Sequence, residues 1–244
     1  MITKNQIKSI SQLKQKKYRN LYNQFVVEGR KGVHELLQSN FKLVHIVALN
    51  ADEFSAYKDK LLIAKQDDLS KMSALTTPPD CLAVFEIPKQ QPVNPEGIIL
   101  ALDDIRDPGN LGTIIRLCDW FGIEHLMCSE DTVDVYNPKV IQATMGSITR
   151  VNIVYDALPR FLEKYPHEIY GTFMKGDIVY NTTFPKNACI IMGNEANGIS
   201  KEVESYIQHR ITIPRFGIHQ KTESLNVATA TAILLNECKR SEYM

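Results

Sequence analysis

The sequence predicts an α/β protein built from two domains. Short apolar runs alternate with helix-compatible segments in both halves of the chain, a polar stretch with three prolines separates the halves, and several apolar runs of the second half break into glycine-containing loops. With 244 residues, 44% of them hydrophobic, the chain can bury a substantial core. We predict a first domain over residues 1–87, a linker over 88–96 and a second domain over 97–244.

The first domain is predicted to be a small α/β sandwich. Its first segment, from Lys4 to Arg19, is polar and helix-compatible, with Ile7, Ile10 and Leu13 spaced as one apolar stripe. The remaining elements alternate in type: a strand over 25–29, a helix over 31–38, strands over 43–49 and 61–64, a short helix over 69–74 and a closing strand over 81–86.

The second domain is predicted to be a mostly parallel sheet covered on both faces, because its strands and helices alternate. We expect strands over 97–102, 124–128, 151–154, 168–173, 188–193 and 210–213. The expected helices cover 110–121, 138–145, 156–164, 200–206 and 226–238. Asn137 before Pro138 is typical of a helix start. The pattern by itself predicts an unknotted doubly wound sheet.

The charge of the chain is unevenly distributed. The formal net charge is zero, so the total does not point to a nucleic-acid partner. Residues 1–31 nevertheless contain eight basic residues and one acidic residue, which gives +7 there and −7 in the rest of the chain. A basic arm of this kind fits phosphate contact, and the alternative is a solvated helix face without a partner.

The cysteines and the hydropathy pattern indicate a cytoplasmic protein. Five cysteines are scattered without C-x-x-C spacing, which predicts buried thiols in a reducing compartment and neither disulfides nor a metal site. No apolar run approaches the length of a membrane span, and the N-terminus has no apolar signal core. We therefore expect no membrane partner.

The segment from Asp103 to Arg116 is the first of three segments that carry chemical information. It follows an apolar run and leads into an apolar periodic segment, so it predicts a strand, a tight loop and a helix. Pro108-Gly109 forces a turn, Asn110 is a good helix N-cap and Gly112 permits a close approach. Arg116 lies near enough to reach the strand ends, where open α/β sheets bind ligands. An ordinary turn with a surface arginine is the alternative.

Two later segments resemble the first in design. After the apolar run 190–192 come Gly193, Glu195 and Gly198, with Ser200 as a helix cap, and after Ile213-Pro214 comes Ser224-Leu225-Asn226-Val227-Ala228. In this order and spacing the three segments resemble the signatures of the SpoU (TrmH-like) family of the SPOUT superfamily. Members of this family are S-adenosylmethionine-dependent RNA ribose 2′-O-methyltransferases. The first domain resembles an L30e-like substrate-binding domain through the strand 25–29 and the helix containing His34-Glu35-Leu36-Leu37.

The resemblance implies a homodimer, a deep trefoil knot from about Glu168 to the C-terminus, and a pocket for S-adenosylmethionine. Gly193, Ile213 and Leu225 are expected to line that pocket, with Thr172 and Met192 as weaker candidates. Glycine would let the main chain approach the adenosine, and apolar side chains would give its ring a dry slot. Core packing is the alternative for Ile213 and Leu225.

The resemblance also implies an attack of a ribose 2′-oxygen on the sulfonium methyl group. Arg116 is expected to orient the hydroxyl and an adjacent phosphate and to stabilise negative charge, since a guanidinium carries only donors and is a poor general base. A phosphate oxygen or a water molecule could then take the proton. Asn110 would position the ribose or hold its loop, and Glu195 would fix Arg116 or its own loop. Ser224 and Asn226 would hold RNA or the methionine moiety. Helix capping is the alternative for Asn110, Ser224 and Asn226, a surface ion pair for Arg116, and a solvated carboxylate for Glu195.

The N-terminal domain favours ribosomal RNA over transfer RNA as the substrate, and a non-catalytic RNA-binding protein on the same fold is a further alternative. A nicotinamide-dependent enzyme is disfavoured because Gly109 and Gly112 do not form G-x-G-x-x-G. The sequence departs from the family pattern at Asn194 and Asn197, where small residues are common, and in the long loop 215–223. In that loop Arg215-Phe216 replaces a methionine, and Arg215, His219 and Lys221 could contact RNA phosphates.

Overall fold

The computed structural model describes residues 1–217 and 224–240 and divides the chain into two compact units. Unit 1 contains Met1–Lys89 and Asp134–Thr149, and unit 2 contains Gln90–Val133 and Arg150–Met244. The chain therefore passes through unit 1 twice.

Unit 2 is built on a six-stranded sheet in which every neighbouring pair is parallel. The strand order is β10-β8-β9-β5-β6-β7. The strands are β5 Ile98–Leu102, β6 His125–Cys128, β7 Asn152–Tyr155, β8 Glu168–Ile178, β9 Ala188–Met192 and β10 His209–Thr212. The predicted parallel sheet is thus confirmed. β8 is longer than predicted because β10 shifts register between Arg210 and Ile211 and pairs with its second half.

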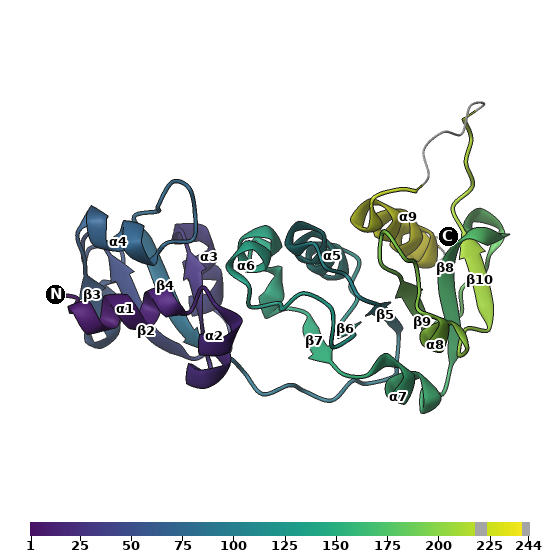
Figure 1. Cartoon of the computed structure of the whole chain (residues 1–244), viewed down its shortest axis with the longest axis horizontal. Coiled ribbons are helices and arrows are strands. Elements are labelled where there is room, and N and C mark those ends of the chain that lie inside the picture. The colour runs from purple at the N-terminus through teal and green to yellow at the C-terminus, as the bar shows by residue number, and fades with distance from the viewer. Residues whose placement is uncertain (218–223, 241–244) are drawn as a thin grey trace. The chain divides into compact units, whose positions relative to one another are not determined.

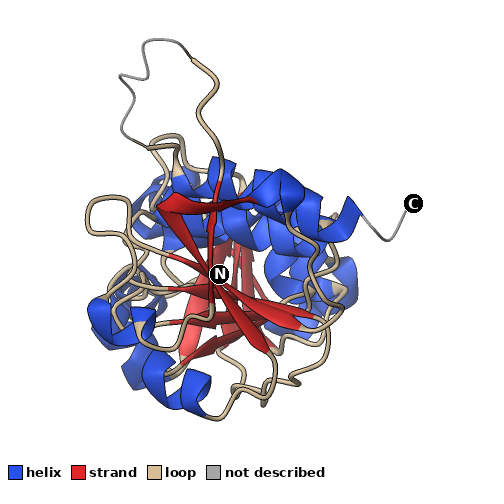
Figure 2. Ribbon diagram, turned by 90° about the vertical axis from the view of Figure 1, so that its right-hand side faces the viewer, coloured by secondary structure: helices blue, strands red, loops and turns tan. Residues whose placement is uncertain are grey.

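Helices cover both faces of this sheet (Figure 1; helices are blue in Figure 2). α5 (Pro108–Trp120) packs against α9 (Val227–Arg240), and α7 (Leu158–Glu163) packs against α8 (Lys201–Glu204). Alternate strand residues face opposite sides. One set forms a core with α7 and α8, and includes Ile99, Ala101, Cys189 and Ile191. β5 and β9 are buried along their whole length, as expected of strands covered on both faces.

Unit 1 contains a four-stranded sheet in the order β1-β4-β2-β3. β4 (Cys81–Glu86) is antiparallel to both β1 (Gln24–Glu28) and β2 (Leu43–Ala48), and β3 (Leu61–Ile63) is parallel to β2. The segment expected to close this domain therefore lies inside the sheet. Its first five residues are all buried, which fits a central strand.

The helices of unit 1 also lie on two faces. α1 (Lys4–Gln12) packs against α4 (Gln66–Met72), and together they cover a core that includes Ile10, Leu69, Val26 and Val84. α3 (Arg30–Leu37) and α6 (Pro138–Thr144) contact β1, and the ring of Phe25 lies 4.8 Å from that of Tyr136. α6 begins with the predicted Asn137 cap, whose side chain accepts a hydrogen bond from the backbone N–H of Lys139. Short 3₁₀ helices at Ser55–Lys60, Ser147–Thr149 and, in unit 2, Val179–Asn181 complete the secondary structure.

The polar segment at the N-terminus forms two helices: α2 (Lys16–Tyr22) follows α1 after a short turn. Arg19 of α2 is 2% exposed. Its Nε and Nη2 donate to Asp134 Oδ2 at 3.0 and 2.5 Å, and its Nη1 donates to the carbonyls of Leu13 and Lys14, both at 2.9 Å. Arg19, one of the basic residues expected to contact phosphate, therefore makes its contacts within unit 1.

The five cysteines are all buried and free, as predicted. Burial raises the pKa of Cys81 to about 12 and also raises the pKa of the other four thiols. Within the described residues, no helix has both the length and the hydropathy needed to cross a membrane.

Replacing Arg19 by methionine is expected to destabilise the protein by about 3–5 kcal/mol, because it leaves the Asp134 carboxylate partly buried without its partner. Urea denaturation of the full chain measures this effect. The double variant Arg19→Met/Asp134→Leu serves as control and should regain most of the loss, since an apolar pair replaces both charges. An unchanged midpoint for Arg19→Met would show that the ion pair does not support the fold.

Candidate active site

The three loops singled out by the sequence follow β5, β9 and β10 of unit 2. Because these strands are parallel, all three loops leave the sheet at the edge formed by the carboxyl ends. β5 and β9 are neighbours, and the strand order reverses between them: β6 and β7 lie beyond β5, whereas β8 and β10 lie beyond β9. This is the position at which open α/β sheets bind ligands.

The first loop leads directly into α5. Asp107 caps this helix by accepting a hydrogen bond from the backbone N–H of Asn110 at 2.8 Å, and Pro108 occupies the first helical position. The prediction that Asn110 is the N-cap, with a helix from 110, was therefore wrong. The Asp-Pro pair was the overlooked signal, since proline favours the first turn and aspartate favours the cap. The side chain of Asn110 is left available for other contacts.

The second loop is closed by Asn194, which is 9% exposed. Its backbone exchanges hydrogen bonds with Gly198 at 3.0 and 2.8 Å, and its Oδ1 accepts from the N–H groups of Ala196 and Asn197. Its Nδ2 donates to the carbonyl of Asp104 at 2.7 Å. Asn194, noted from the sequence only as a departure from the family pattern, thus fastens the second loop to the first. The side-chain amide supplies both the donor and the acceptor that these contacts require.

Gly193 is required by the same loop. A Cβ atom built at Gly193 would lie 2.4 Å from the carbonyl carbon of Gly198 and from the nitrogen of Ile199. From the sequence, this glycine is expected to let the main chain approach a ligand closely. The close approach in the structure is made by the loop's own backbone, and a role in ligand binding stays a prediction.

The side chain of Asn110 brings the three segments together. Its Nδ2 donates to Glu195 Oε1 at 2.5 Å, and its Oδ1 accepts from Asn226 Nδ2 at 2.8 Å. Asn226 Oδ1 in turn accepts from the backbone N–H groups of Ala228 and Thr229, at 3.0 and 3.2 Å. Asn226 therefore caps α9 and also contacts the first segment. Helix capping, the alternative considered for Asn226, is therefore present, and a role of this residue in holding RNA or the methionine moiety stays a prediction.

The orientation of both amides follows from the chemistry at the two ends of this chain of hydrogen bonds. A carboxylate only accepts and a backbone N–H only donates. Asn226 must therefore direct its oxygen to α9 and its NH₂ to Asn110, and Asn110 must direct its NH₂ to Glu195. Glu195, predicted to fix Arg116 or its own loop, is bound to Asn110.

Arg116 lies on the exposed side of α5, six residues after Asn110, and within the described ranges it has no hydrogen bond or ion pair. The surface ion pair considered for it is therefore not present among these residues. Ser224 is exposed. Asn226, and not Ser224, provides the cap of α9.

The residues predicted to bind the cofactor lie at the same edge. Leu225 is 47% exposed, which excludes core packing, and Ile213 is half-buried directly after β10. Met192 is buried at the end of β9, and Thr172 donates its hydroxyl to the carbonyl of Ile191 at 3.0 Å. Arg215 is exposed, whereas His219 and Lys221 lie outside the described residues.

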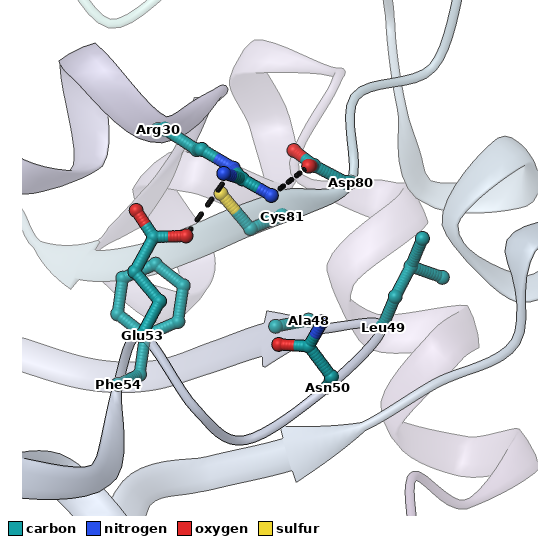
Figure 3. Close-up of a pocket in the computed structure, with 8 residues that line it drawn as sticks. All are labelled: Arg30, Ala48, Leu49, Asn50, Glu53, Phe54, Asp80 and Cys81. Atoms are coloured by element: carbon teal, nitrogen blue, oxygen red, sulfur yellow. Dashed lines mark hydrogen bonds and ion pairs between the residues drawn. The ribbon is translucent and has the colours of Figure 1, made fainter.

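Unit 1 contains a pocket whose lining includes Arg30, Glu53, Asp80 and Cys81 (Figure 3). The guanidinium of Arg30 pairs with Asp80 at 2.5 Å and with Glu53 at 3.2 Å. The hydrogen bond to Asp80 and the charges of both carboxylates raise the pKa of Arg30. A guanidinium already paired with two carboxylates is poorly suited to bind a phosphate. Arg30 is therefore a second basic residue of the N-terminal segment, after Arg19, that is engaged within unit 1.

Comparison with known proteins places these loops in a family. The sequence model of the SpoU rRNA Methylase family matches residues 97–236, a range that contains all three loops. The chain belongs to this family. The model of an MRM3-like substrate binding domain matches residues 4–83.

Similar proteins of known sequence or structure extend over the whole chain. The chain is similar to the 23S rRNA (guanosine(2553)-2′-O)-methyltransferase RlmP of Bacillus subtilis, with 28% identity over 95% of both chains. It also resembles a TrmH-family protein from Porphyromonas gingivalis, with a TM-score of 0.89 and 37% identity over 99% of both chains. An AdoMet-bound rRNA methyltransferase from Sinorhizobium meliloti gives a TM-score of 0.88 and 29% identity over 99% of this chain and 96% of that one. These neighbours confirm the predicted SPOUT fold.

Replacing Gly193 by alanine is expected to destabilise the protein by about 1–3 kcal/mol, because the new methyl group overlaps the backbone at Gly198 and Ile199. Thermal unfolding of the full chain measures this change. Gly217→Ala is a matched control, since a Cβ there meets nothing within 4 Å and should leave the midpoint unchanged. If both variants unfold at the wild-type temperature, the second loop does not have the tight turn described here.

Proposed function

We propose that this SpoU-family chain is an S-adenosylmethionine-dependent RNA ribose 2′-O-methyltransferase that acts on ribosomal RNA. The observation that carries the proposal is the bridge from Asn110 to Glu195 and Asn226, which joins the three family segments at one edge of the sheet. The 23S rRNA 2′-O-methyltransferase and the AdoMet-bound rRNA methyltransferase among its relatives support both the reaction and the cofactor.

The residues at this edge fit the proposed cofactor. Leu225 and Ile213 offer apolar surface beside polar backbone, a combination typical of small-molecule sites. In this proposal Gly193, Ile213 and Leu225 hold S-adenosylmethionine, Met192 contributes from the end of β9, and Thr172 contributes from within β8. When bound, the cofactor supplies a sulfonium methyl group that a nucleophile can accept.

Arg116 is the proposed catalytic residue. A neutral ribose hydroxyl is a weak nucleophile, and its oxygen becomes more negative as it reacts. The guanidinium has five N–H donors, so Arg116 can orient the hydroxyl and a neighbouring phosphate and stabilise the developing charge. Asn110, held by Glu195 and Asn226, would position the ribose against Arg116, and the exposed hydroxyl of Ser224 is available to RNA or to the methionine moiety.

Arg116→Ala is expected to lower methyl transfer by about 10²–10³-fold, because it removes the donors that stabilise the developing charge. Transfer of tritiated methyl groups from S-adenosylmethionine to ribosomal RNA measures the rate, and calorimetry measures cofactor affinity, which should not change. Arg160→Ala, which removes an exposed arginine of α7, is the matched control and should retain full activity.

The same assay separates the alternatives. Labelling of transfer RNA but not of ribosomal RNA would identify the other substrate class. A folded wild-type protein that binds no S-adenosylmethionine would indicate a non-catalytic RNA-binding protein, and the proposal would be wrong.

Four further expectations belong to this proposal: residues 1–87 act as the RNA-binding domain, the C-terminal part of unit 2 forms the trefoil knot, the protein is a homodimer, and it works in the cytoplasm. The match of an MRM3-like substrate binding domain supports the first, and the five buried free thiols agree with the last. An experimental structure tests the knot, sedimentation equilibrium tests the dimer, and cell fractionation tests the location.

A further inference from the structure

Helices α1 and α2, drawn in purple in Figure 1, carry exposed side chains that the catalytic proposal does not use. Residues 1–27 contain no acidic residue. Five lysines of this stretch are exposed, and no ion pair is found for them among the described residues: Lys4, Lys8, Lys14, Lys16 and Lys17. We call this surface the α1–α2 face.

The contacts that hold α2 in unit 1 determine which of its side chains are exposed. Arg19 is its buried residue, bound to Asp134 and to two backbone carbonyls. Lys17 and Leu21, and likewise Tyr18 and Tyr22, are four residues apart and therefore neighbours on the helix surface. Leu21 is 68% exposed and Tyr22 is 43% exposed.

The two tyrosines form an aromatic platform next to positive charge. Their rings stack, with centroids 6.2 Å apart and an interplanar angle of 13°. The ammonium group of Lys17 lies 4.7 Å from the centroid of the Tyr18 ring. Aromatic rings next to positive charge are the combination with which proteins bind single-stranded nucleic acid.

The neighbouring carboxylates do not neutralise this surface. α4, which packs against α1, carries Asp67 and Asp68. Asp68 pairs with Lys71 of its own helix at 3.1 Å. The Nζ of Lys14 donates to the backbone carbonyl of Lys71 at 2.9 Å. Because a carbonyl carries no net charge, the positive charge of Lys14 is not neutralised by this contact.

We infer that the α1–α2 face binds an unpaired segment of the RNA substrate, with lysines on the phosphates and a base stacked on the tyrosine platform. This inference rests on the proposed function. Stacking favours unpaired RNA, because a duplex covers both faces of its bases whereas a loop or single strand presents them. Lysines alone would bind either form through their phosphates.

Fluorescence anisotropy with the full chain tests the inference, with a 12-nucleotide single-stranded RNA and an RNA duplex of equal length as probes. Tyr18→Ala/Tyr22→Ala is expected to weaken single-strand binding about tenfold and to leave duplex binding unchanged. Tyr18→Phe/Tyr22→Phe keeps the aromatic rings and should bind as the wild type does. Tyr22→Ala alone, at an exposed position, gives the same test with little risk to folding.

The lysines are tested through the salt dependence of binding. Lys16→Gln/Lys17→Gln should reduce the slope of log affinity against log salt by about 1.4, or about 0.7 for each lost phosphate contact to a single strand. Lys58→Gln/Lys65→Gln, which removes two exposed lysines elsewhere in unit 1, should leave the slope unchanged.

Two results would overturn the inference. The first is equal affinity of the wild-type protein for the duplex and the single strand. The second is full affinity of the alanine variants for the single strand while the wild type methylates ribosomal RNA. In either case the α1–α2 face does not read unpaired bases, and the proposed function stands. If the wild type transfers no methyl group to any RNA, the proposed function fails, whatever the anisotropy results.

Discussion

The arrangement of the candidate site depends on one side-chain amide with two different ends. Asn110 gives its NH₂ to Glu195 and its oxygen to Asn226, so a single residue at the start of α5 fixes two loops that follow it in the chain by 85 and 116 residues. Aspartate could not donate to Glu195, and leucine could do neither. The need for a donor toward Glu195 and an acceptor toward Asn226 explains why asparagine occupies position 110, without reference to any bound molecule.

That amide can act only because the sheet brings the loops to the same edge. Parallel strands place the ends of β5, β9 and β10 on one side, and the burial of both sheet faces makes their register difficult to change. The loop after β9 is then held close to the loop after β5 by Asn194, and it closes tightly because Gly193 has no side chain. Hydrogen bonds and close packing thus hold these two loops, whereas Arg116 and Leu225 are exposed to solvent.

Local pattern in the sequence predicted most of the framework and part of the site. Alternation of apolar runs and helical periodicity located the strands and helices within a few residues, and motif spacing selected the three loops. Two features could not be obtained in this way. The central place of β4 and the contacts of Asp134 and Tyr136 with α2 and β1 depend on long-range packing, which leaves no local signal. At Asn194, hydrogen bonds to its own loop and to Asp104 decided the residue type, and composition does not reveal them.

The double passage of the chain through unit 1 affects how the protein is made. Residues 1–89 contain all four strands of that unit but lack α6, the ring that packs on Phe25 and the carboxylate that neutralises Arg19. During synthesis the first unit therefore cannot be complete until residues up to 149 have been translated. By then β5, α5 and β6 of the other unit have also been translated. The two units do not mature strictly one after the other, as consecutive domains commonly do on the ribosome, and the N-terminal sheet spends that interval with one apolar face incompletely covered.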